Sequence, residues 1–153
     1  MKNQLIFIAS MFVVLACRDA NTKFLGKIDG RWQVNTATYS GGAGRDSTAT
    51  LSTTFLTFDP CSASSNGGSP SNCKLQYTSN NQQFSFAYQA TNEGKSIYIS
   101  PTSQMSDASY REVADRIAGG YEVLTSSDNA LVIRRSLAGS GSKYQYVQFS
   151  ASK

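Results

Sequence analysis

The sequence predicts an all-β fold, an antiparallel up-and-down barrel of about eight strands with one short helix near residues 107–118. Three observations support this prediction. Short runs of alternating apolar and polar residues recur along the chain, and turns rich in Gly, Asn and Ser separate them. The composition is 40% hydrophobic but only 16% charged, and its many Ser, Thr, Gly and Tyr residues favour strands and turns. Sequential antiparallel strands can close into a barrel, which removes exposed sheet edges.

The first part of the predicted barrel contains five strands. The clearest alternation is that of Phe84, Phe86 and Tyr88, which are separated by small or polar residues. Asn80-Asn81 predicts a hairpin turn because Asn tolerates positive φ, and Pro101 ends the fifth strand. The predicted strands span residues 31–40, 48–58, 73–79, 82–90 and 95–100.

The period then changes to that of a helix. Tyr110, Val113, Ala114 and Ile117 fall on one helical face, and Gly119-Gly120 fits the C-terminal end of the helix. Polar turns join the remaining strands, which we predict at residues 121–125, 130–136 and 144–150.

The first seventeen residues have the layout of a secretory signal. Lys2 supplies the positive charge, and the apolar run that follows, about twelve residues, is too short to span ~30 Å of hydrocarbon. Val14-Leu15-Ala16-Cys17 resembles the bacterial lipobox. This resemblance implies that Cys17 carries a diacylglycerol and an acyl chain such as palmitate, which together anchor a protein stably. A plain signal peptide or an uncleaved anchor is the alternative.

This interpretation divides the chain into three parts. Residues 1–16 are a lipoprotein signal peptide, residues 17–23 are the lipidated Cys and a polar tether, and residues 24–153 are one β-barrel domain. The expected location is the cell envelope, held to a membrane by lipid, with the outer membrane favoured and the face left open.

Cys61 and Cys73 remain as a pair once Cys17 is assigned to lipid. Export implies an oxidising compartment, so we predict a disulfide between them. Two free thiols or a metal pair are the alternatives, and a metal site would need further Cys or His ligands. The chain contains no His, so we expect no bound metal.

Gly30-Arg31-Trp32 resembles the G-x-W motif of lipocalins and lipocalin-like proteins. Thr57-Phe58-Asp59 and Gly120-Tyr121-Glu122-Val123 also resemble segments of bacterial lipocalin-like lipoproteins, and the likeness covers residues 24–150. It implies that Gly30 allows a tight turn into the barrel and that Trp32 closes one end. It further implies an Arg packed across that Trp, here Arg134 or Arg135.

Several functions are disfavoured by composition. Without His the usual catalytic triads are absent, so we expect no enzyme activity and no cofactor. The net charge of +4 is scattered, so we expect no nucleic acid partner. Asp46-Ser47-Thr48 matches a short bacterial O-glycosylation signal that would modify Ser47.

Two functions stay open. The first is binding of a small apolar ligand inside the barrel. Its expected contacts are Phe84, Phe86, Tyr88, Ile97, Ile99, Arg134, Arg135, Tyr144 and Tyr146, although these residues also suit a solid core. The second is a module that binds an envelope protein, or inhibits an enzyme, through loops 41–47 and 61–73 around a filled barrel.

Overall fold

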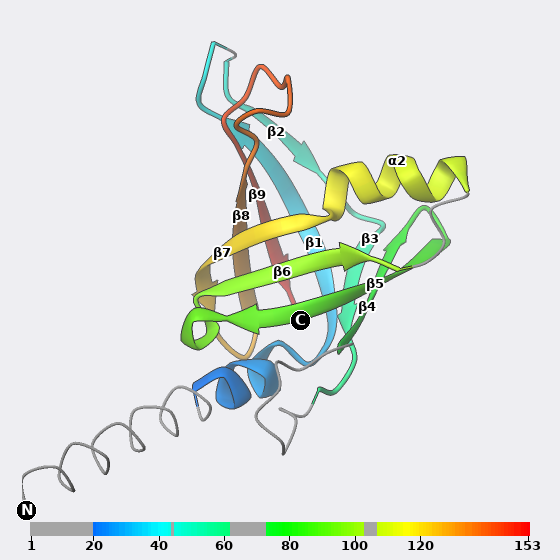
Figure 1. Ribbon diagram of the computed structural model, residues 1–153, viewed down its shortest axis with the longest axis vertical. Helices are drawn as coiled ribbons and strands as arrows, with labels where there is room; N and C mark the ends of the chain where they lie inside the picture. The colour runs from blue at the N-terminus through cyan, green and yellow to red at the C-terminus, as the bar shows by residue number, and fades with distance from the viewer. Residues whose placement is uncertain (1–19, 44, 62–72, 103–106) are drawn as a thin grey trace, which may run out of the picture.

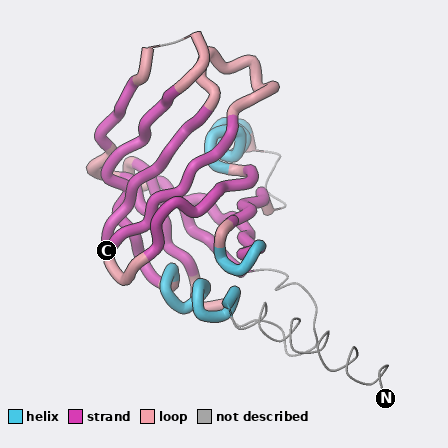
Figure 2. The backbone as a smooth tube through the Cα atoms, turned by 90° about the vertical axis from the view of Figure 1, so that its left-hand side faces the viewer, coloured by secondary structure: helices cyan, strands magenta, loops and turns pink. Residues whose placement is uncertain are grey.

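The computed structural model of the protein describes residues 20–43, 45–61, 73–102 and 107–153 (Figure 1). Across these ranges nine strands form one antiparallel sheet in the order β2-β1-β3-β4-β5-β6-β7-β8-β9, and β1 also pairs with β9. The sheet therefore closes on itself, and Figure 2 shows the strands wrapping around a common interior. The strands are β1 (Gly30–Ser40), β2 (Ser47–Thr50), β3 (Thr54–Phe58), β4 (Cys73–Ser79), β5 (Gln82–Thr91), β6 (Ser96–Pro101), β7 (Gly119–Ser126), β8 (Ala130–Ser136) and β9 (Tyr146–Ser152).

The predicted strand 48–58 is interrupted in the structure. Its first part, β2, pairs with the second half of β1, and its second part, β3, pairs with the first half of β1. The backbone N–H of Leu51 still donates to the carbonyl of Asn35, at 2.8 Å, between the two parts. β2 and β3 thus form one broken strand along a single edge of β1, and the predicted eight-stranded up-and-down barrel is confirmed.

The predicted helix near residues 107–118 is also confirmed, as α2 (Ala108–Ile117). Asp107 precedes it and accepts a hydrogen bond from the backbone N–H of Ser109 at 2.8 Å, which caps the first turn. Hydrogen bonds from the Ser109 side chain and backbone hold the pKa of Asp107 below its usual value. Tyr110, Ala114 and Ile117 are the buried residues of the helix.

The described residues include a second helix, whereas the sequence predicted only one helix. Residues 20–28 are helical, so the helix begins within the segment 17–23 that was predicted to be the lipidated Cys and a polar tether. Phe24, Leu25 and Ile28 are 6%, 2% and 0% exposed, so this helix packs its apolar side against the barrel. A short 3-10 turn, η1 (Asn92–Gly94), lies beside it, and the Gly94 N–H donates to the side chain of Asn21 at 2.8 Å.

The two helices lie at opposite ends of the barrel. The helix at residues 20–28 leads directly into β1, whereas α2 joins β6 to β7 at the other end (Figure 1). We call these the N-terminal end and the α2 end. No helix in the described ranges is long and apolar enough to cross a membrane. The predicted signal peptide and Cys17 lie outside the described residues.

Strand boundaries differ from the prediction in two places. β9 begins at Tyr146 rather than Tyr144, because residues 137–145 form a longer loop that includes two positive-φ glycines. β7 begins at Gly119 rather than Tyr121, because Gly119 enters the strand with a φ of 139° and does not stop it. β9 also ends two residues later than predicted, at Ser152, and apart from the broken strand 48–58 the remaining boundaries agree with the prediction within one residue.

The predicted disulfide is present. Cys61 and Cys73 are bonded, with their Cα atoms 5.4 Å apart. The bond joins the segment after β3 to the first residue of β4, and Cys73 is buried. It therefore closes the base of the connection between two neighbouring strands of the barrel.

Candidate functional site

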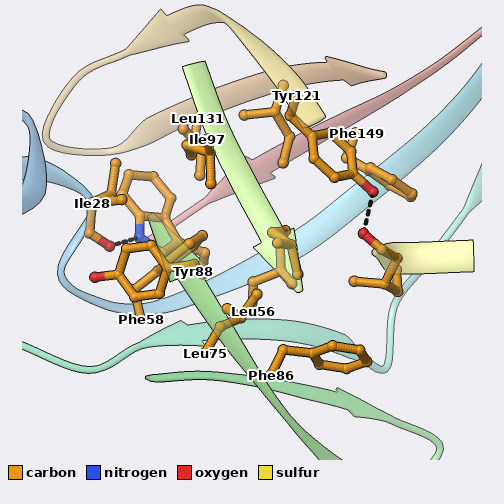
Figure 3. Close-up of a cluster of buried hydrophobic side chains, with 14 of the residues drawn as sticks. Ile28, Leu56, Phe58, Leu75, Phe86, Tyr88, Ile97, Tyr121, Leu131 and Phe149 are labelled. Atoms are coloured by element: carbon orange, nitrogen blue, oxygen red, sulfur yellow. Dashed lines mark hydrogen bonds between the residues drawn. The ribbon is translucent and has the colours of Figure 1, made fainter. Parts of the chain in front are cut away.

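The half of the barrel nearest the N-terminal helix has a solid core (Figure 3). Trp32 is fully buried, and its indole N–H donates to the carbonyl of Ile28 at 2.6 Å. The rings of Phe58 and Tyr88 meet edge to face with centroids 5.0 Å apart. The Tyr88 hydroxyl donates to the carbonyl of Asp59 at 3.2 Å. These contacts leave this half of the interior occupied by the protein's own side chains.

A small cavity remains towards the α2 end. Its volume is about 10 Å³, which is roughly enough for one water molecule. Ile117 of α2 closes it from one side, and the Tyr121 hydroxyl donates to the carbonyl of Ile117 at 2.7 Å. Its lining is mainly apolar and comprises Val34, Thr54, Leu56, Tyr77, Ile99, Ile117, Tyr121, Ile133 and Phe149.

Five of the predicted ligand contacts come from β5 and β6. Phe86, Tyr88, Ile97 and Ile99 are buried inside the barrel, but Ile99 alone among them lines the cavity. Phe84 is half-buried at the α2 end, where its ring lies 6.3 Å from that of Tyr110. Most of this predicted set therefore fills the core of the described structure.

Arg134 and Tyr146 lie on the outer face of the barrel, contrary to the expectation that they face the interior. Alternation along β9 turns Val147 and Phe149 inward, so Tyr146 points outward and is 38% exposed. Arg134 forms an ion pair with Glu122 at 2.6 Å on the same outer face.

Tyr144 precedes β9 and lies away from the cavity. It is half-buried, and its ring centroid is 5.5 Å from that of Tyr39. The ammonium of Lys143 lies 5.2 Å from the same ring centroid. This aromatic pair supports the loop at the α2 end.

Arg135 binds the C-terminal end of α2. Its guanidinium donates to the carbonyls of Ala118 and Asp115, and it lies 5.8 Å from the ring centroid of Tyr121. A cation at a helix C-terminus interacts favourably with the unpaired carbonyls there. The side chain thus fixes α2 and a cavity-lining tyrosine in one place.

The cation over Trp32 corrects another expectation. Lys153, rather than Arg134 or Arg135, lies over the ring, with its Nζ 4.6 Å from the centroid. The same ammonium donates to the carbonyl of Lys27 at 3.1 Å. The arginines cannot reach the indole, because Arg134 faces outward and Arg135 lies at the α2 end. Gly30, which precedes this tryptophan, has a φ of 101° and makes the turn into β1.

Two buried tyrosines, Tyr88 and Tyr121, have raised side-chain pKa values. Burial raises the pKa of Tyr88 well above its ordinary value, and the charges of Asp29 and Asp59 add to the shift. Burial also raises the pKa of Tyr121, although Arg135 opposes the shift. Both hydroxyls therefore stay protonated at neutral pH and donate to backbone carbonyls.

Sequence reasoning missed most of the cavity lining. Val34, Leu56, Ile133 and Phe149 lie on inward-facing positions of β1, β3, β8 and β9. Their alternation was visible in the sequence, but alternation alone does not show which layer of the barrel a residue occupies. Ser47, the predicted glycosylation site, is exposed on β2. The described residues contain no group of three or more Cys, Asp or Glu side chains placed to hold a metal ion.

Comparison with solved structures identifies the fold. The chain matches the crystal structure of a lipocalin-like protein from Bacteroides uniformis ATCC 8492 with a TM-score of 0.53 and 15% sequence identity. The match covers 84% of this chain and 99% of that chain. No protein-family model matches the chain, and neither does any curated protein. The match shows that the described residues form a lipocalin-like barrel.

Proposed function

We propose that this chain is an exported lipoprotein, anchored by lipid on Cys17, whose non-catalytic lipocalin-like barrel binds a small apolar ligand at the α2 end. The observation that carries the ligand proposal is the mainly apolar cavity beneath Ile117. Thr54, Tyr77 and Tyr121 carry its polar side-chain groups. Two of the three are already engaged, since the Tyr121 hydroxyl donates to Ile117 and Thr54 shares a hydrogen bond with Ser79 at 3.4 Å. Such a lining favours hydrocarbon over a charged group.

The ligand must move α2 to enter. The cavity of about 10 Å³ is far smaller than the ~300–1,000 Å³ of ordinary ligand sites. Ile117 is the one residue of α2 in the lining, and Gly119 follows directly with a φ of 139°. Displacement of the last turn of α2 would enlarge the cavity, at the cost of the hydrogen bonds from Tyr121 to Ile117 and from Arg135 to Ala118. The ligand that fits this geometry is a slender hydrocarbon chain.

Uptake of cis-parinaric acid, measured by fluorescence, tests the ligand proposal. Ile117→Ala should bind the probe more tightly than the parent chain, because it widens the cavity entrance. Val113→Ala is the matched control, since Val113 is a half-buried residue of the same helix and does not line the cavity. Absence of probe uptake by all three chains, together with no lipid in an organic extract of the natively purified protein, would contradict ligand binding.

Metabolic labelling with a palmitate analogue tests the anchor. The parent chain should incorporate the label and sediment with membranes, and Cys17→Ser should do neither. A Cys61→Ser/Cys73→Ser variant is the control, because it removes both other cysteines and keeps Cys17. Equal labelling of parent and Cys17→Ser chains would end the lipoprotein proposal. Separation of inner and outer membranes would then test the outer-membrane location.

A second function is favoured by the filled interior itself. If the cavity never opens, the loops 41–47 and 61–73 are the surfaces proposed for binding an envelope protein, although residues 44 and 62–72 lie outside the described residues. Loop 41–46, between β1 and β2, is mostly exposed where it is described. Capture of a single envelope protein by the parent chain, lost on replacing this loop and accompanied by no probe uptake, would favour the interaction module.

A further inference from the structure

The outer face of β6, β7, β8 and β9 carries an open hollow of about 300 Å³, separate from the barrel interior. Outward-facing residues of four adjacent strands surround it. The residues that line it are Ser96, Gly120, Tyr121, Glu122, Arg134, Ser136 and Tyr146, of which Tyr121 is buried with its ring inside the barrel.

Gly120 is the reason that the face is hollow. It lies directly opposite Tyr98 in the β6–β7 ladder, and it has no side chain to cover the sheet there. A Cβ atom at Gly120 would lie 3.8 Å from Cδ2 of Tyr98, so the Tyr98 ring lies beside this glycine, at the rim and outside the residues that line the hollow. On the other side lies Tyr146, which is paired with Ser136 across the β8–β9 ladder.

The two bordering tyrosines are unusually exposed. Tyr98 is 52% exposed and Tyr146 is 38% exposed, and of the large hydrophobic residues in the described ranges only Leu124 is comparable. Both rings are therefore open to contact with a ligand that lies in or beside the hollow. Each ring offers a flat apolar surface with a polar hydroxyl at its edge.

An ion pair with no net charge, Arg134 with Glu122, lies between the rings of Tyr98 and Tyr146. Arg134 and Glu122 pair directly opposite each other in the β7–β8 ladder, with Nη2 and Oε2 2.6 Å apart. The Arg134 guanidinium also lies 5.1 Å from the ring centroid of Tyr146, which helps to fix its position. Their side chains stay 38% and 57% exposed, so donors of the guanidinium and lone pairs of the carboxylate still face solvent.

We infer that this hollow binds a neutral saccharide. The charges of Arg134 and Glu122 cancel, which disfavours a phosphate, an acidic sugar or a charged peptide. Sugar hydroxyls both donate and accept hydrogen bonds, so they match a guanidinium beside a carboxylate. The apolar C–H face of a pyranose ring fits against an exposed tyrosine ring, here Tyr98 or Tyr146. The glycine floor leaves room for the sugar between them.

Titration of the full-length chain in detergent with maltohexaose, cellohexaose and xylohexaose tests this inference, with trigalacturonate as the acidic probe. At least one neutral probe should bind with a dissociation constant near 1 mM or below, about −4 kcal/mol. Tyr98→Ala and Tyr146→Ala should each weaken binding by about tenfold or more. Gly120→Ala should also weaken it by filling the floor, and it should fold normally because its new Cβ makes only an ordinary contact.

Leu124→Ala is the matched control, since Leu124 is 40% exposed on β7 and does not line the hollow. It should leave sugar binding unchanged. The inference is overturned if no neutral probe binds, if binding survives both tyrosine substitutions, or if trigalacturonate binds equally well. Uptake of cis-parinaric acid should be the same in all these variants. Loss of the saccharide inference for the outer hollow can therefore be distinguished from loss of the ligand proposal for the interior cavity.

Discussion

Trp32 shows how one residue connects the start of the chain to the barrel. Its indole N–H donates a hydrogen bond to the carbonyl of Ile28 at the end of the first helix, and Lys153 lies over its ring. The sequence motif predicted that Trp32 closes one end, and the structure places it there. The predicted cation, Arg134 or Arg135, was wrong, because the cation that reaches the ring depends on where β9 ends and places Lys153.

Replacing Trp32 with Phe should lower the free energy of unfolding by about 2–4 kcal/mol. The smaller ring leaves a void, and the Ile28 carbonyl loses its buried donor. Urea unfolding followed by far-UV circular dichroism measures the change, because Trp32 is the only tryptophan of the chain and the variant loses indole fluorescence. Leu124→Ala should change stability by less than about 0.5 kcal/mol. Equal stability of the Trp32→Phe and parent chains would refute this role.

The buried tyrosines predict a loss of stability at high pH. Tyr121 has an ordinary pKa of 10.0 when unfolded and a much higher one when folded. Above about pH 10 the unfolded chain therefore binds fewer protons than the native chain, so the free energy of unfolding falls as pH rises. The slope is up to about 1.4 kcal/mol per pH unit for one such tyrosine.

Urea unfolding of the parent and Tyr121→Phe chains at several values between about pH 8 and pH 11 measures this slope. The variant should lose stability less steeply, because its ring has no proton to lose. Comparison with the parent removes the contribution of lysines, which titrate in the same range. Parallel curves for the two chains would show that Tyr121 ionises as readily in the folded state as in the unfolded one.

Elements with a regular pattern were predictable, and those that depend on tertiary contacts were not. The alternation of β4, β5 and β8 and the helical period of α2 are local, so their bounds follow closely from the sequence. The break at residues 51–53 is not local, because it arises where one edge of β1 passes from β3 to β2. The helix at residues 20–28 has apolar positions at Phe24, Leu25 and Ile28, but only the barrel end buries them.

The contact between the N-terminal helix and η1 can be tested with two glycines. Gly94 has a φ of 80°, and a Cβ there would lie 2.5 Å from Cβ of Phe24. Gly139 has a φ of 83° with nothing within 4 Å. Both Ala variants incur the cost of positive φ, about 1–2 kcal/mol. Gly94→Ala should cost about 1–3 kcal/mol more, because it also overpacks against the helix.

Thermal and urea unfolding of the two variants measure this difference. A Phe24→Ala/Gly94→Ala double variant should show non-additive stability, since removing the ring relieves the clash. If Gly94→Ala and Gly139→Ala destabilise equally, the helix at residues 20–28 does not pack on η1 in solution.

At the scale of the whole molecule, closure of the barrel is its defining property. Thr36 pairs with Ser150, and neighbouring positions of β1 and β9 pair in the same way. The strand order followed from the sequence, because strands that are consecutive along the chain pair with one another in an up-and-down barrel. The sequence did not predict whether the interior is hollow or filled, because Phe86, Tyr88 and Ile97 suit the wall of a ligand cavity as well as a solid core. Side-chain volumes relative to the size of the barrel decide that question.

A matched pair of proline substitutions tests closure. Gln148 of β9 and Thr48 of β2 both lie opposite Thr38 of β1. Gln148 has a strand on each side, so a proline there always removes a ladder hydrogen bond, at a cost of about 3 kcal/mol or more. Thr48 lies on a short edge strand and should tolerate proline better. Melting temperatures measure the two effects, and an equal drop for both variants would mean that β9 does not close the barrel.

The opposite directions of β1 and β9 also determine how the molecule carries mechanical load. Both Gly30 and Ser152 lie at the N-terminal end. A force that separates these two residues therefore breaks the hydrogen bonds of the β1–β9 ladder one after another, starting at the N-terminal end. A force between Gly30, where β1 begins, and Tyr146, where β9 begins at the other end of the barrel, instead acts along both strands. It loads the hydrogen bonds between them together, because these bonds lie perpendicular to the strands. The barrel is thus mechanically strong along the axis between its two ends and weak across the β1–β9 seam.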